Sequence, residues 1–220
     1  AGAVGKSSTV QAAYAALVGS RKVRYTPGNS ETGVPLGILN IKQTGYGAWD
    51  WFKIACKAFF PHPHLEDVEV LIVEMGTDEL LPPKNMDYLL SIVQPDIAVW
   101  LNVYAAHLSQ FALGLTHAEK KLPEHEKARL LIKKIAAEDG KIITRSACHT
   151  AIYCLDNPPI VQELAPFKDG LSKKHVVTFG VQKDATLGYG ASRVTLAGTT
   201  FEFVRGGMAV GVTLPGFVLP

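Results

Sequence analysis

Residues 1–10 read AGAVGKSSTV and lead into the first predicted helix, VQAAYAALV (residues 10–18). Glycines let the backbone approach a ligand closely, and backbone N–H groups at a helix N-terminus favour an anion. In such a loop the Lys6 ammonium would lie near the β- and γ-phosphates of a nucleotide, and the Ser7 hydroxyl would bind Mg²⁺. The match is to G-x-x-G-K-S-S, without the first glycine of the full pattern, so an ordinary small-residue turn fits these residues too.

The composition bounds the class of protein. The chain has 220 residues, of which 47% are hydrophobic and 19% charged, with a formal net charge of +2. This length suffices for one large domain or two small ones with a sizeable core. The balanced charge gives no argument for nucleic acid or an acidic membrane surface as partner. We expect no membrane insertion, because no apolar run reaches the roughly 18 residues that span a bilayer.

The cysteines and the two ends of the chain give further expectations. Cys56, Cys148 and Cys154 are scattered, without a C-x-x-C pair, which predicts reduced core thiols in a cytoplasmic protein. A phosphate-binding loop normally follows a buried strand, and no strand precedes Gly2. The chain also stops after VTLPGFVLP without a closing helix, so we expect flanking N- and C-terminal domains.

Apolar runs alternate with helical segments over most of the chain. Continuous apolar runs with β-branched residues are typical of buried parallel strands. The predicted strands are KVRYT (22–26), VEVLIVEMG (68–76), DIAVWLNV (96–103), KIIT (141–144) and AIYCL (151–155). Helices are predicted for residues 45–64, 85–93 and 124–138, the last one ending at Asp139-Gly140.

The pattern changes near Lys174, where short alternating segments are separated by glycine turns. These segments are HVVTFGV (175–181), ASRVTLAG (191–198), TTFEFVRGG (199–207) and MAVGVTLPG (208–216). They predict antiparallel strands. The sequence therefore predicts an α/β fold: a P-loop NTPase-like, mostly parallel sheet flanked by helices over residues 1–173, with a small antiparallel β portion over residues 174–220.

Three further polar stretches carry candidate chemistry. Glu74 ends a buried strand and is followed closely by a glycine, where an α/β sheet places metal or water ligands, although a surface glutamate fits as well. A carboxylate there is costly to bury unless it meets a cation. Asn102 ends the next strand, His107 follows five residues later, and Lys127 lies on the amphipathic helix. Taken alone, the histidine fits a capping residue and the lysine a solvated one.

Taken in this order, the stretches resemble the central ATPase domain of the Mur ligases, most closely the UDP-MurNAc-tripeptide–D-alanyl-D-alanine ligase branch. The matching stretches are GAVGKSSTVQAAYAAL, YTPGNSETGVPLGIL, VLIVEMG, PDIAVWLNVYAAHLSQF, EKARLLIKKIAAEDGKII and TFG…GTTFEF…VTLPG. The family also has an N-x-D-D stretch after a following strand, and TRSACHT (144–150) stands in its place here. The resemblance covers almost the whole chain.

The resemblance implies ATP-driven amide-bond formation through an acyl phosphate, with two Mg²⁺ ions. It implies that Ser7 and Glu74 bind one ion, and that His107 and a carbamylated lysine serve the second. Lys127 matches that lysine best, and Lys121 is the alternative. Lys6, His107 and Lys127 would then be the catalytic residues. The residues implied to bind ATP are Gly2, Ala3, Val4, Gly5, Lys6, Ser7, Ser8 and Asn102, and Thr26 and Asn29 would face the UDP-sugar peptide.

The implied activity is addition of D-Ala-D-Ala, or a similar amine, to a UDP-MurNAc-peptide. This reaction belongs to peptidoglycan synthesis in the cytoplasm, and so to cell-wall growth, cell shape and cell division. A folylpolyglutamate-synthase-like or cyanophycin-synthetase-like ligase remains an alternative. So does a P-loop NTPase, kinase or nucleotide-binding module outside the ligases.

Overall fold

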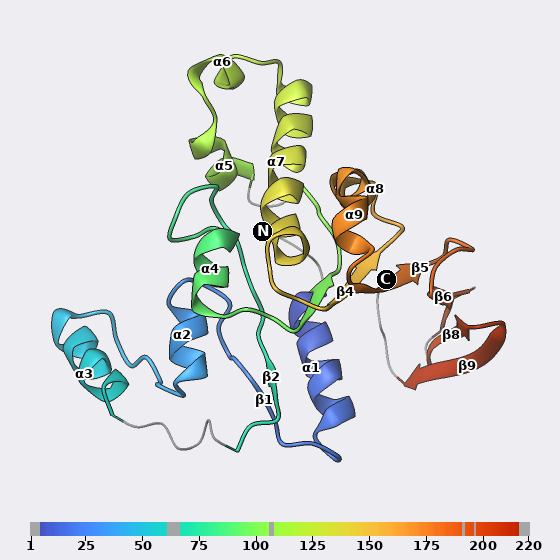
Figure 1. Cartoon of the computed structure of the whole chain (residues 1–220), viewed down its shortest axis with the longest axis horizontal. Helices are drawn as coiled ribbons and strands as arrows, with labels where there is room; N and C mark the ends of the chain where they lie inside the picture. The colour runs from blue at the N-terminus through green and yellow to red at the C-terminus, as the bar shows by residue number, and fades with distance from the viewer. Residues whose placement is uncertain (1–4, 61–66, 106–107, 191, 196, 216–220) are drawn as a thin grey trace. The chain divides into compact units, whose positions relative to one another are not determined.

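The computed structural model describes residues 5–60, 67–105, 108–190, 192–195 and 197–215, whose elements are drawn in Figure 1. Its contacts divide the chain into two compact units. Unit 1 comprises Ala1–Val93 and Tyr104–Glu138, and unit 2 comprises Gln94–Val103 and Asp139–Pro220. This division does not coincide with the predicted boundary at residue 173. The α/β class with a predominantly parallel arrangement of strands is confirmed.

Unit 1 carries a two-stranded parallel sheet and most of the helices. Its elements are α1 (Lys6–Leu17), β1 (Val23–Tyr25), α2 (Gly33–Ile38), α3 (Ala48–Ala58), β2 (Val70–Ile72), α4 (Met86–Ile92), α5 (Leu108–Phe111), η2 (Ala112–Gly114), α6 (His117–Lys120) and the first part of α7 (Glu124–Thr144). Strand β1 pairs with β2 from Val23 opposite Val70 to Tyr25 opposite Ile72. The predicted strands KVRYT and VEVLIVEMG are thus confirmed.

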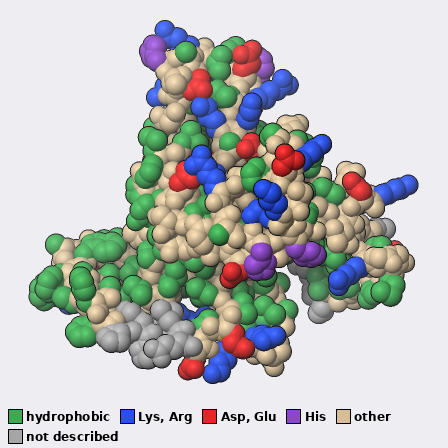
Figure 2. Space-filling model, viewed as in Figure 1, with side chains coloured by type: hydrophobic (Ala, Val, Ile, Leu, Met, Phe, Trp, Pro, Cys, Tyr) green, Lys and Arg blue, Asp and Glu red, His purple; other side chains and the backbone are tan. Residues whose placement is uncertain are grey.

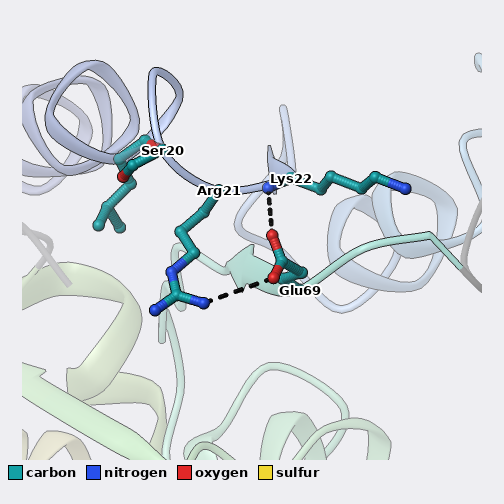
Figure 3. Close-up of polar contacts among 5 residues, drawn as sticks. Ser20, Arg21, Lys22 and Glu69 are labelled. Atoms are coloured by element: carbon teal, nitrogen blue, oxygen red, sulfur yellow. Dashed lines mark hydrogen bonds and ion pairs between the residues drawn. The ribbon is translucent and has the colours of Figure 1, made fainter.

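Directly before the two strands, the carboxylate of Glu69 contacts Lys22 and Arg21, as Figure 3 shows. Glu69 accepts a hydrogen bond from the backbone N–H of Lys22 at 2.7 Å and one from the Arg21 guanidinium at 3.5 Å. The Lys22 N–H and, less strongly, the nearby Arg21 charge lower the pKa of Glu69 below its ordinary value, because both favour the ionised form. The contact fixes where β1 begins relative to β2.

The buried core of unit 1 is mainly apolar, and it also contains two polar side chains that contact the start of α4. Fully or almost fully buried side chains are Val34, Leu89, Phe111, Leu131 and Ile135. Helix α4 begins at the buried Asn85, whose side chain accepts from the Tyr88 N–H at 3.2 Å. The buried carboxylate of Glu138, on α7, accepts from the Met86 N–H at 2.7 Å. Two backbone donors that the helix itself cannot satisfy are therefore paired inside unit 1.

Unit 2 contains a seven-stranded mixed sheet. Its strands are β3 (Ile97–Trp100), β4 (Thr150–Cys154), β5 (His175–Gly180), β6 (Leu187–Tyr189), β7 (Arg193–Thr195), β8 (Gly198–Arg205) and β9 (Met208–Pro215). They run in the order β3-β4-β5-β6-β8-β7, and β9 pairs with β8. Its helices are α8 (Pro158–Leu164), η3 (Ala165–Phe167) and α9 (Lys168–Leu171).

The direction of pairing changes within this sheet. Strands β3, β4, β5 and β6 pair in parallel, whereas β8 pairs antiparallel with β6, β7 and β9. The predicted antiparallel character of the C-terminal portion is right for its last strands. It is wrong for β5, because His175–Gly180 lies between β4 and β6 inside the parallel part.

Helix α7 is longer than predicted and removes one predicted strand. It continues to Thr144, so KIIT forms its last turn and the strand predicted for residues 141–144 is wrong. Gly140 does not end the helix. A Cβ atom there would lie 3.0 Å from the Trp100 ring and 3.1 Å from Cγ of Glu163, so close packing explains the glycine. In the described part of the chain, no helix is both long and apolar enough to cross a membrane.

The cysteines match the prediction in part. Cys148 is buried, Cys154 is half-buried and Cys56, on α3, is exposed, so the expectation of a core thiol is wrong for Cys56. Burial raises the pKa of the Cys154 thiol, because the thiolate loses hydration.

Candidate nucleotide and metal site

Helix α1 begins directly after a glycine in a left-handed conformation. Gly5 precedes the helix at φ 89°, a left-handed conformation that favours glycine, and its carbonyl accepts from the Thr9 N–H at 2.8 Å. No side chain among the described residues caps this end, and no acidic residue occupies the first turn. Lys6 is half-buried, and Ser7 and Ser8 are exposed. The residues Gly2, Ala3 and Val4 lie outside the described residues.

The predicted pair of Ser7 and Glu74 is brought together in unit 1. The Ser7 hydroxyl donates to Oε2 of Glu74 at 2.8 Å, and Nδ2 of Asn29 donates to Oε1 of the same carboxylate at 3.0 Å. We call Ser7, Asn29 and Glu74 the Glu74 cluster. Ser7 and Asn29 precede Glu74 by 67 and 45 residues in the sequence, and both side chains contact its carboxylate.

Parallel strand pairing explains how the Glu74 cluster forms. The carboxyl ends of β1 and β2 lie at the same edge of their sheet, and the Thr26 N–H donates to the Ile72 carbonyl at 3.0 Å, just beyond the last pair. Asn29 and Glu74 lie in the loops that leave these ends. The Gly76 N–H donates to the Asn29 carbonyl at 2.8 Å, and a Cβ on Gly76 would lie 3.2 Å from the Asn29 side chain. Only a residue without a side chain permits this approach without a shift.

The oxygen atoms of Ser7 and Glu74 in this cluster are of the kind that binds Mg²⁺. A serine hydroxyl and a carboxylate are hard oxygen ligands, and Mg²⁺ is usually bound by one or two such groups together with phosphate oxygens and water. Ser7 Oγ and Glu74 Oε2 lie close enough to ligate one ion with little movement. The described residues contain no group of three or more His, Cys, Asp and Glu side chains arranged for a metal.

The predicted substrate-facing residues differ in exposure. Asn29 is exposed, although its amide is engaged by Glu74. Thr26 is buried at 3% exposure, and a Cβ on Gly37 would come within 2.8 Å of the Thr26 Cβ. Thr26 is therefore packed closely against Gly37. A direct contact of Thr26 with a substrate stays a prediction.

Among the described residues, no contact joins the residues that are predicted to bind a second metal. Lys127 lies in the first turn of α7 with its side chain 20% exposed, and its ammonium contacts Oε1 of Glu124 at 2.7 Å. Lys121, at the end of α6, is exposed. His107 lies outside the described residues. A carbamylated lysine at either position stays a prediction.

Unit 2 holds Asn102 and a residue that the sequence analysis missed. Asn102 is half-buried just after β3, and the next residue, Val103, is clamped by Asn157. The Val103 N–H donates to Oδ1 of Asn157 and the Val103 carbonyl accepts from Nδ2, both at 3.3 Å. Asn157 is buried at 7% exposure and follows β4, the parallel neighbour of β3. It thus fixes the backbone beside Asn102.

Asn157 could have been found from the sequence. Its signal is Asp156-Asn157 directly after the apolar run AIYCL, a polar pair at the end of a buried strand. A strand predicted at KIIT places TRSACHT at a strand end instead, but TRSACHT begins at the last residue of α7. The neighbouring Asp156 accepts from the Val181 N–H with both oxygens, at 3.0 and 2.8 Å, and from the Tyr189 hydroxyl at 3.1 Å.

Comparison with known proteins gives matches in structure. No protein-family model and no curated protein sequence matches this chain. Among solved structures, a MurF ligase from Thermotoga maritima in complex with ADP has a TM-score of 0.61 and 22% identity, covering 98% of this chain and 39% of that one. A MurF from Acinetobacter baumannii has a TM-score of 0.59 and 16% identity, covering 96% and 36%.

A folylpolyglutamate synthase is also similar. The apo form of the L. casei enzyme has a TM-score of 0.54 and 14% identity, covering 96% of this chain and 51% of that one. The chain thus spans between about a third and a half of the length of these structures. At these identities the likeness concerns the fold: the chain shares the fold of Mur ligases and folylpolyglutamate synthase, as the resemblance in sequence predicts.

Proposed function

We propose that this chain is the ATP-binding portion of an ATP-dependent ligase of the Mur type, which joins an acid to an amine. The observation that carries the proposal is the Ser7–Glu74 contact of 2.8 Å, directly after the Gly5-Lys6 turn that opens α1. Lys6 is the first residue of this helix, and the hydroxyl of the next residue contacts the Glu74 carboxylate. The shared fold with ATP-dependent ligases supports the same conclusion.

The chemistry follows from these groups. ATP places its phosphates at the start of α1, where backbone N–H groups and the helix dipole favour negative charge. Lys6 adds a positive charge beside the phosphoryl group that moves to the substrate carboxylate. Ser7 and Glu74 would hold Mg²⁺, which neutralises phosphate charge when it is bound. The resulting acyl phosphate is attacked by the amine, and phosphate leaves from a tetrahedral intermediate to give the amide.

Further residues are proposed for the second metal and for ATP. Lys127, once carbamylated, would present carboxylate-like oxygens instead of an ammonium, and it would bind a second Mg²⁺ together with His107. The ion pair with Glu124 must then break, because two anions repel each other. Lys121 is the alternative lysine. Asn102, held through Val103 by Asn157, is proposed to lie near the phosphates.

The proposed substrates are a UDP-MurNAc-peptide and D-Ala-D-Ala, which places the reaction in peptidoglycan synthesis in the cytoplasm. The exposed Asn29 and the buried Thr26 are the proposed contacts with the UDP-sugar peptide. Because the similar ligases are longer, we propose that further domains bind the sugar nucleotide and the incoming amine. Folate polyglutamylation is the second candidate, favoured by the likeness to folylpolyglutamate synthase.

Phosphate release from ATP by the full-length protein tests this proposal. We expect release only when UDP-MurNAc-tripeptide and D-Ala-D-Ala are both present, and loss of release in Glu74→Gln. Release with a folate and glutamate instead would favour the second candidate. Equal stimulation by an unrelated acid–amine pair would reject the substrate assignment. ATP hydrolysis that needs neither acid nor amine would place the protein outside the ligases.

A further inference from the structure

Helix α3 turns its apolar face outward. Trp49, Phe52, Cys56 and Phe59 follow one another at helical spacing and all are exposed, whereas Ile54 on the opposite side is buried at 8% exposure. The exposed fractions are 66% for Trp49, 56% for Phe52 and 91% for Phe59. An amphipathic helix of a globular protein normally buries its apolar stripe. Figure 2 shows hydrophobic side chains gathered over α3, at the lower left of the view.

The aromatic side chains of this stripe are ordered against one another. The rings of Trp49 and Phe52 are stacked with centroids 5.3 Å apart and an interplanar angle of 16°, and the Lys53 ammonium lies 5.7 Å from the Trp49 ring centroid. Tyr46 and Phe60, at 85% and 69% exposure, extend the apolar surface at both ends of the helix. A contiguous exposed patch of large apolar side chains marks an interaction surface.

The charge around the stripe is positive. Residues 42–60 contain three lysines (Lys42, Lys53 and Lys57), all exposed, and one acid, Asp50, which gives a formal charge of +2. The Asp50 carboxylate accepts from the Gly47 N–H at 3.2 Å, so it is engaged at the N-terminus of its own helix. Lys53 and Lys57 are one helical turn apart and form a row beside the aromatic stripe. The formal charge of the whole chain is also only +2, so the composition alone does not reveal this local excess of positive charge.

We propose that α3 is an interfacial helix that binds the surface of an anionic phospholipid bilayer. Trp, Tyr and Phe with flanking Lys are the side chains that settle at the boundary between headgroups and acyl chains. Lysine stems lie along apolar surface while their ammonium groups reach the lipid phosphates. Eleven residues span about 16 Å, so α3 lies in the interface and does not cross the bilayer. The lysine row favours an anionic lipid surface over an apolar protein groove.

Vesicle flotation of the full chain tests the proposal. We expect flotation with vesicles of phosphatidylcholine mixed with phosphatidylglycerol, weaker flotation with phosphatidylcholine alone, and release by salt. Trp49 and Trp51 are two of the chain's three tryptophans and Trp100 is buried, so binding should shift the fluorescence to shorter wavelength. The double variant Phe52→Glu/Phe59→Glu should weaken binding by roughly a hundredfold.

Two more variants separate lipid binding from misfolding. Phe59→Glu changes a side chain that is 91% exposed, so it should leave the fold intact and still weaken binding by roughly tenfold. Leu113→Glu introduces the same charge at a 69% exposed residue of η2 and should bind as the wild type does. Absence of flotation, or equal flotation of the Phe59→Glu and Leu113→Glu variants, would overturn the proposal. Self-association that requires Phe59, without vesicle binding, would overturn it in favour of a second copy as occupant.

Discussion

Two helices of unit 1 begin in opposite ways. The start of α4 is closed by protein groups: Asn85 accepts from the Tyr88 N–H, the Glu138 carboxylate accepts from the Met86 N–H, and both side chains are buried. The start of α1 has a left-handed Gly5, no side-chain cap among the described residues and no acid in its first turn. It carries Lys6 and exposes Ser7.

The difference matches the proposed roles: the start of α4 stabilises the fold, and the start of α1 is proposed to bind a nucleotide. A helix N-terminus leaves backbone donors unsatisfied and attracts negative charge. In α4 the negative charge is the buried Glu138 carboxylate, which accepts from the Met86 N–H and contributes to the stability of the fold. In α1 no side-chain cap is present among the described residues, and the nearby carboxylate, Glu74, accepts from the Ser7 hydroxyl and from Asn29. We therefore expect a bound phosphate to meet the start of this helix. Changes at α4 should therefore lower stability, and changes at α1 should lower nucleotide affinity.

The largest effect on the binding side is expected for Lys6→Ala. Loss of a charge-assisted contact to phosphate should lower the affinity for Mg-ATP by about 100-fold, or about 2.7 kcal/mol, with little change in stability. Isothermal titration calorimetry measures the affinity. Lys22→Ala, an exposed lysine paired with Asp67, is the matched control and should bind ATP normally. If the Lys6→Ala variant binds Mg-ATP with the wild-type affinity, the proposal that this loop binds phosphate is wrong.

On the structural side, Glu138→Ala should have the largest effect. It leaves the buried Met86 N–H without its acceptor and should lower the free energy of unfolding by about 2 kcal/mol. Urea denaturation measures this change. Glu126→Ala removes a half-exposed carboxylate from the same helix and should change stability by less than about 0.5 kcal/mol. If the two variants lose equal stability, the buried contact does not stabilise α4.

A smaller loss is expected for Asn85→Ala. The substitution removes the N-cap acceptor of α4 and should cost about 1 kcal/mol of stability, again measured in urea. Asn85→Asp keeps an acceptor and should recover most of this loss. Mg-ATP affinity of the folded protein should be unchanged in both variants. A drop in affinity as large as that of Lys6→Ala would erase the distinction between the two helix ends.

The smallest effect is expected at Glu69, an exposed carboxylate that also binds a backbone N–H. The pKa of Glu69 is lowered in the folded protein from an ordinary value of 4.5, so its contribution is present above that pH and is lost as the pH falls through the lowered value. The wild type should therefore be more stable than Glu69→Gln near neutrality, and the difference should vanish in acid.

Denaturation midpoints across this pH range measure the difference. Arg21→Ala should keep most of the pH dependence, because the Lys22 N–H is the larger cause of the lowered pKa. A stability difference that grows in acid would contradict the direction of the shift.

Local patterns were enough to predict the parts of the fold that depend on neighbouring residues. The apolar run VLIVEMG gave the strand that carries Glu74, and the small-residue turn before α1 gave the position of Ser7. The resemblance to the Mur ligases implied that Ser7 and Glu74 bind one metal, and the structure brings the two side chains to 2.8 Å.

The misses depend on contacts between residues distant in sequence. Gly140 looked like the end of a helix, but it packs against Trp100, which no local pattern reveals. The alternating run of β5 resembled an antiparallel strand, although its position between β4 and β6 is set by the whole sheet. The outward aromatic face of α3 was also hidden, because an apolar periodicity does not say which side is buried.

The most direct test of the account is the dependence of ATP affinity on Mg²⁺ in the Glu74 cluster. Calorimetry compares ATP binding with Mg²⁺ and with a chelator for the wild type, Ser7→Ala and Glu74→Gln. We predict that Mg²⁺ tightens ATP binding to the wild type by about tenfold or more and that both variants lose this gain while they stay folded. Retention of the full gain in both variants would contradict the assignment of Ser7 and Glu74 as the metal ligands beside the nucleotide.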